Sequence, residues 1–142
     1  MKDTRYKDGF SLIEVLIAIV LVGLAIASLV TANSAFTKAN GAGVELSTAE
    51  FLIEQIRERT VLVDYVDLYA FDDESFCPPQ NANGVVLNEL AAFSQQITVE
   101  NVSASDFEQV EIDHSSDFVR VTVKVFLNSR QISSAKWLRT RY

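Results

Sequence analysis

The most constraining feature of this sequence is an apolar run from Phe10 to Val30 that contains a single charged residue, Glu14. An apolar stretch of about 20 residues is long enough to cross a bilayer as a helix. A carboxylate inside such a segment costs roughly 2.5–3.5 kcal/mol on insertion scales, so it needs a partner and usually has a function. The run therefore predicts a membrane-spanning helix whose one carboxylate has a specific role.

A short motif opens this run and reads Gly9-Phe10-Ser11-Leu12-Ile13-Glu14, directly behind a leader with three basic residues. It resembles, without a mismatch, the cleavage and methylation motif of type IV pilins and type II secretion pseudopilins. The resemblance implies that a membrane prepilin peptidase cuts after Gly9 on the cytoplasmic side. The same enzyme would N-methylate Phe10, the new N-terminus.

The resemblance also implies a role in assembly for Glu14, which would neutralise the terminal amine of a neighbouring subunit. Residues four apart share one face of a helix, so Phe10 and Glu14 are expected on the same side. Two opposite charges in apolar surroundings are tolerable together and expensive apart. We therefore expect Gly9 and Phe10 to form the cleavage site, and Glu14 to be the charge-pairing residue.

Two other interpretations of the N-terminus stay open. Ala25-Ile26-Ala27 has the A-x-A pattern of a secretory signal peptide cut after Ala27. The apolar region of a signal peptide spans about 7–15 residues, which argues against this interpretation. An uncleaved signal anchor that carries an unrelated domain is the second alternative. In all three cases the basic leader predicts a cytoplasmic N-terminus and places everything after Val30 outside.

Hydrophobic periodicity divides the rest of the chain. The helix is expected to continue outside the membrane, with a weak point at Asn40–Gly43 and an extension to about Val66 left open. A stripe at i, i+3, i+4 and i+7 is typical of a helix face packed on a sheet, and it consists of Ala49, Leu52, Ile53 and Ile56. The predicted segments are a leader (1–9), a transmembrane and assembly helix (10–30), a helix continuation on the head (31–59) and a globular head (60–142).

The head is predicted to contain a loop at 72–84 and antiparallel strands over about 97–140. Alternation of apolar and polar residues indicates strands at Ile97–Val102, Phe107–Asp113, Phe118–Leu127 and Gln131–Thr140. Val85–Gln96 is interpreted as a short helix. Short connections favour a consecutive antiparallel meander. The expected fold class is α+β, a long N-terminal helix on a small antiparallel sheet, which is also the pilin architecture.

The charges are unevenly distributed. The full chain has a net charge of −7, and the chain without residues 1–9 would have 9 basic and 17 acidic residues. Such a composition lacks the basic patch of a nucleic-acid-binding protein. No Lys or Arg lies between Thr60 and Val119, whereas from Arg120 onward there are six basic residues and no acidic one. We expect acidic and basic side chains to pair between strands of one sheet, with Asp72–Glu74 left without a charge partner. Contact between oppositely charged faces of neighbouring subunits is a second possibility that stays open.

Little in the head indicates chemistry. The acidic run Asp72-Asp73-Glu74 could ligate calcium but lacks the EF-hand pattern, and a solvated loop is the favoured interpretation. His114 lies in a polar stretch typical of a turn, not of a catalytic triad. Cys77 is the only cysteine, so it is expected as a part-buried loop residue, with an intermolecular bridge left open. No enzyme activity and no cofactor are expected.

The sequence thus predicts a structural subunit of a type IV pilus or type II secretion pseudopilus. The chain resembles a minor subunit, because its single cysteine cannot form an intrachain disulfide and its head is small. Expected partners are the prepilin peptidase and N-methyltransferase, other pilin or pseudopilin subunits, an assembly platform membrane protein and, before assembly, inner membrane lipid. The alternative is a membrane-anchored extracytoplasmic binding module that does not polymerise.

Overall fold

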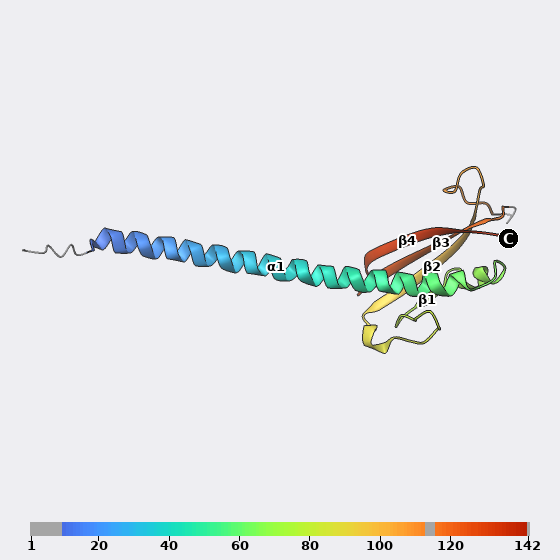
Figure 1. Cartoon of the computed structure of the whole chain (residues 1–142), viewed down its shortest axis with the longest axis horizontal. Coiled ribbons are helices and arrows are strands. Elements are labelled where there is room, and N and C mark those ends of the chain that lie inside the picture. Colours follow the sequence, from blue (N-terminus) through green and yellow to red (C-terminus); the bar gives the residue numbers. More distant parts are fainter. Residues whose placement is uncertain (1–9, 113–115, 142) are drawn as a thin grey trace, which may run out of the picture. The chain divides into compact units, whose positions relative to one another are not determined.

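The structure is a computed structural model that describes residues 10–112 and 116–141. The predicted leader and His114 lie outside these residues. The chain forms two compact units, Met1–Ala42 and Gly43–Tyr142. In chain order the elements are α1 (Leu12–Val61), the 3-10 helix η1 (Asp67–Phe71), β1 (Ser75–Phe76), the 3-10 helix η2 (Asn88–Leu90), β2 (Phe93–Val102), β3 (Phe118–Leu127) and β4 (Arg130–Thr140) (Figure 1).

The helix α1 ends at Val61, just beyond the predicted continuation and short of the extension to Val66. It passes through Asn40–Gly43 without a break, so the predicted fraying is absent. A glycine in a helix interior costs only about 1 kcal/mol relative to alanine. Two glycines with helical residues on both sides are therefore not enough to end the helix.

The core of the head lies between the last turns of α1 and one face of the sheet. The predicted helix stripe is fully buried in one cluster with the inward valines of β3, as predicted. These residues are Ala49, Leu52, Ile53, Ile56, Val119, Val121, Val123 and Val125. Because side chains alternate between the two faces of a strand, the intervening residues of β3 face away from the helix.

The sheet is antiparallel with the strand order β1-β2-β3-β4, which confirms the predicted meander and the α+β fold class. The hairpin between β3 and β4 turns at Asn128 and Ser129, with φ values of 48° and 68°. Positive φ at both central residues is typical of the tight turns that match the twist of antiparallel strands. β1 was not predicted; it lies inside the expected loop 72–84.

The predicted short helix at Val85–Gln96 is wrong. The only helical turn in that range is η2, and β2 begins at Phe93, earlier than the predicted Ile97. Alternate residues of β2 are buried from Phe93 onward, but two of the buried positions are polar, Gln95 and Asn101. Polar residues on the inward face obscured the period of two that indicates a strand.

Hydrogen bonds explain why these two amides can be buried. The Gln95 Nε2 atom donates to the Leu52 carbonyl at 2.9 Å and to the Gln80 carbonyl at 3.1 Å, and its Oε1 accepts from the Gln80 N–H. The Asn101 side chain donates to the Ser116 carbonyl at 2.9 Å and accepts from the Ser116 N–H. Both amides thus tie loops to the sheet, and Gln95 also contacts α1.

The predicted strand at Phe107–Asp113 is also wrong, and Asp113 itself is outside the described residues. Phe107 and Glu108 form a turn, and the segment makes one isolated bridge, between Val110 and Val102. The Asp106 side chain accepts a hydrogen bond from the Glu108 N–H, an Asx turn that competes with strand pairing.

The expected pairing of acidic and basic residues within the head is confirmed. Arg120 on β3 contacts Glu100 on β2 at 2.7 Å and Glu108 at 3.1 Å. Glu108 also pairs with Lys136 on β4. Arg130 reaches Glu45 of α1 at 2.7 Å. The exposed pairs Lys136–Glu108 and Arg130–Glu45 contribute at most about 1 kcal/mol each, so they orient the segments more than they stabilise the fold.

Candidate functional site

The N-terminal end of α1 is built around Ser11. Phe10 and Ser11 precede the helix, which begins at Leu12. The Glu14 N–H donates to the Ser11 carbonyl at 3.1 Å and lies 3.4 Å from the Ser11 Oγ atom. This is the arrangement of an N-cap serine with a glutamate three residues later, which satisfies otherwise free N–H groups of the first turn. Gly9, on the other side of the expected scissile bond, lies outside the described residues.

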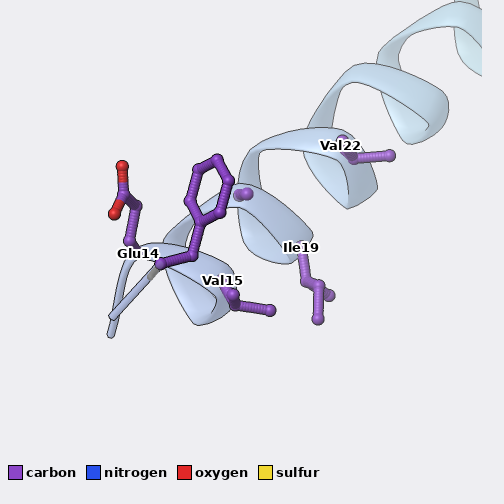
Figure 2. Close-up of a pocket in the computed structure, with 6 residues that line it drawn as sticks. Glu14, Val15, Ile19 and Val22 are labelled. Atoms are coloured by element: carbon purple, nitrogen blue, oxygen red, sulfur yellow. The ribbon is translucent and has the colours of Figure 1, made fainter. Parts of the chain in front are cut away.

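Phe10 and Glu14 line one open groove, together with the apolar residues Val15, Ala18, Ile19 and Val22. Figure 2 shows the Glu14 carboxylate apart from the side chains of Val15, Ile19 and Val22, which project from another side of the helix. Phe10 is 82% exposed, so nothing in the described chain covers the groove. The groove offers an apolar wall with a carboxylate at its edge.

Glu14 has no ion-pair partner among residues 10–112 and 116–141. It lies in the first turn of α1, where the helix dipole favours a negative charge. Glu14 lies in α1, which is the one helix among the described residues that is long and apolar enough to cross a membrane. A carboxylate in this position needs a cation from elsewhere once the helix leaves water.

Other residues singled out from the sequence lie in the second unit. The Asp72 Oδ1 atom accepts a hydrogen bond from the Val99 N–H at 2.8 Å, which is a backbone contact and not an ion pair. Cys77 is exposed, not part-buried as predicted. The described residues contain no group of three His, Cys, Asp or Glu side chains that could hold a metal ion. His114 lies outside them.

Sequence reasoning missed one residue of this site, the cap Ser11. Its signal was present in the sequence, since Ser-x-x-Glu ahead of an apolar run is the pattern of a capping box. The pattern was interpreted only as part of the cleavage motif. The local role at the helix N-terminus belongs to Ser11, which accepts from the backbone N–H of Glu14.

Tyr65 is a strongly perturbed ionisable group of the head and lies in a polar cluster beside the end of α1. Its hydroxyl donates to the Ser116 carbonyl at 3.2 Å. Its ring lies edge-on to the ring of Tyr69, with 6.2 Å between the two ring centroids. Burial raises the pKa of Tyr65 to about 12, and the hydrogen bond to Tyr69 and the Asp117 carboxylate act in the same direction. The nearby Arg141 opposes this shift.

This raised pKa predicts an alkaline loss of stability. Unfolded Tyr65 ionises near pH 10, whereas the folded residue keeps its proton to about pH 12. The unfolded state therefore binds fewer protons in this window, and the free energy of unfolding falls as the pH rises from about 10 to about 12. Urea unfolding of residues 44–142 across this window should show the decline, and Tyr65→Phe should flatten it. An equal decline in the variant would exclude Tyr65 as the cause.

Comparison with known protein families yields a match at the N-terminus. A family model described as the prokaryotic N-terminal methylation motif matches residues 4–30. The match covers residues 4–9 of the leader, the expected cleavage site, the cap and the apolar part of α1, and ends before the head. No curated protein and no solved structure matches this chain.

Proposed function

We propose that this chain is a member of the type IV pilin and pseudopilin family and a structural subunit of a type IV pilus or type II secretion pseudopilus. The observation that supports the proposal best is the methylation motif at residues 4–30, in register with a helix whose first turn holds the Glu14 carboxylate. The motif makes the chain a pilin-like precursor, and its apolar helix is suited to membrane anchoring.

In this proposal the peptide bond between Gly9 and Phe10 is hydrolysed at the cytoplasmic side of the inner membrane. The new amine of Phe10 is then N-methylated by the same prepilin peptidase. The head lies on the extracytoplasmic side, since the basic leader favours a cytoplasmic N-terminus. An assembly platform protein would then draw the processed subunit from the lipid into the filament.

Assembly uses the groove at the start of α1. The Phe10 amine of one subunit would pair with the Glu14 carboxylate of a neighbour, while the apolar wall of the groove buries part of the neighbour's helix. Pairing removes the cost of leaving either charge alone in apolar surroundings. The head itself supplies no chemistry in this proposal, which includes neither an enzyme activity nor a cofactor.

We further assign the chain to the minor subunits. With one cysteine it cannot form the intrachain disulfide that the resemblance associates with many major pilins. The 77–87 loop is instead held by side chains from the rest of the head: Gln95 bonds to both backbone groups of Gln80, Gln55 accepts from the Ala82 N–H, and Arg59 donates to Gln80. This assignment is testable by counting copies per filament.

Processing provides the direct test. Mass analysis of the membrane-inserted chain should show an N-terminus at N-methyl-Phe10. In Gly9→Val the full-length precursor should accumulate, because the added side chain blocks a close backbone approach in the peptidase cleft. Gly23→Val is the matched control, since a side chain at Gly23 meets nothing within 4 Å. It should be processed normally.

Other masses identify the alternatives. A chain that starts at Ser28 would show signal peptide cleavage after Ala27. An intact Met1 would show an uncleaved anchor and support a tethered binding module that does not polymerise. A normal mature mass in Gly9→Val would contradict the peptidase assignment.

A further inference from the structure

The two edges of the head sheet are both open. β4 pairs with β3 along its length, and β1 pairs with β2 through Ser75 and Phe76. Within residues 10–112 and 116–141, no strand or isolated bridge pairs with the outer side of either strand. An open edge presents a row of backbone donors and acceptors to any strand that can reach it. The eleven-residue β4 is therefore an available template.

The usual protection against edge pairing is weak on β4. Natural edges are often short, or carry proline or bulges. β4 contains no proline, and its one register irregularity lies near its start, opposite Val125 and Phe126. Lys136, which could guard the edge, is paired with Glu108.

The two edges differ in charge. The segment directly before β1 carries three acidic residues and no basic one: Asp72, Asp73 and Glu74. β4 and the residue after it carry Arg130, Lys136, Arg139 and Arg141, with no acidic residue. Carboxylates of the same chain contact Arg130 and Lys136. Arg139 donates to the carbonyls of Thr60 and Val63, and no carboxylate of residues 10–112 and 116–141 forms an ion pair with it.

We infer that the open edge of β4 pairs with the acidic β1 edge of a second copy of this chain. All neighbouring strands in the sheet are antiparallel, and the strand number is even, so β1 and β4 run in opposite directions. In two copies that share one orientation, β4 of the first therefore meets β1 of the second as an antiparallel pair. Pairing of β4 with β4 would instead place basic residues against basic residues, which is unfavourable.

This pairing is heterologous and leaves a free edge at each end, so it can repeat along a filament. It is also small, because β1 has only two residues in the sheet. It needs copies that are already held side by side, and it therefore rests on the proposed function. The contact would orient neighbouring heads, while the N-terminal helices hold the subunits together.

Cysteine cross-linking in the full-length chain tests this contact. Cys77 directly follows β1 and is exposed, and Ser134 is an exposed residue of β4. Cells that express Ser134→Cys are treated with a short bis-maleimide, and filaments are sheared and analysed by mass spectrometry. A dimer that joins position 77 of one copy to position 134 of another is expected. The product should be absent in the wild type, in Ser134→Cys combined with Cys77→Ser, and in the matched control Thr122→Cys on the inner strand β3.

Charge reversal gives a second readout. Glu74→Lys should lower the yield of the cross-link about two- to five-fold, the range expected when an attractive cross-strand pair becomes repulsive. Glu89→Lys changes the same charge within η2, outside the acidic segment that leads into β1, and should leave the yield unchanged. An equal yield in Glu74→Lys would contradict an electrostatic choice of edge.

The outcomes separate this inference from the proposed function. Filaments that contain the methylated chain without the 77–134 product would overturn the edge contact alone. A product that joins position 134 to itself or to another protein would do the same. The 77–134 product in an unprocessed chain that stays in the membrane would uphold the contact and overturn filament assembly. An unprocessed chain without the product would overturn both.

Discussion

Glu14→Val is expected to be exported and cleaved like the wild type but to be depleted from sheared filaments by about tenfold or more. Valine makes a better membrane helix than glutamate, so insertion should not suffer. In the filament, however, the Phe10 amine of the neighbour would be left without a partner. Breaking a buried ion pair costs about 3–5 kcal/mol, and each 1.4 kcal/mol is a factor of ten in an equilibrium. Quantitative blots of membrane and filament fractions measure the effect.

Two further substitutions separate charge pairing from helix capping. Glu14→Asp keeps the charge but shortens the side chain by one methylene, so incorporation should be partly retained. Ser11→Ala removes the side chain that caps the helix and should cost about 1 kcal/mol of local helix stability, with a smaller loss of incorporation. Unchanged incorporation of Glu14→Val would remove the assembly role and favour a tethered module or a tip subunit.

Val121→Asp is expected to unfold the head. Val121 is completely buried between the helix stripe of α1 and its neighbours on β2 and β4. A carboxylate there would have no partner, and a buried unpaired charge is among the few changes that cost about 4 kcal/mol or more. Domains of this size are stable by about 5–15 kcal/mol, so most of that stability would be lost.

The adjacent residue is a matched control. Thr122 lies on the outer face of β3, opposite Lys136 of β4, where an added carboxylate stays in contact with water and a basic neighbour. Thr122→Asp should change the free energy of unfolding by less than about 1 kcal/mol. The comparison uses urea unfolding of residues 44–142, which lie within the second compact unit. Equal effects of the two substitutions would show that the faces of β3 are wrongly assigned.

At positions where apolar residues are buried and polar residues are exposed, the sequence by itself was sufficient to predict the structure. The apolar run with its one carboxylate, the stripe at Leu52, Ile53 and Ile56, and the alternating valines of β3 all follow the rule that apolar side chains leave water. Residues at those positions face one environment and repeat with the period of their element. The helix, the main strand and the meander could therefore be predicted.

Tertiary structure decided the positions where polar residues are buried or apolar residues stay exposed. Gln95 and Asn101 lie inward on β2 because the carbonyls of Leu52, Gln80 and Ser116 accept their hydrogen bonds, and those partners are distant in sequence. The alternating segment after Asp106 resembled a strand, but the Asp106 side chain turns it, and the ion pairs of Glu108 with Arg120 and Lys136 hold it on the outer face. A hydrogen bond or ion pair between distant residues has no period, so it leaves no pattern in the sequence that could predict it.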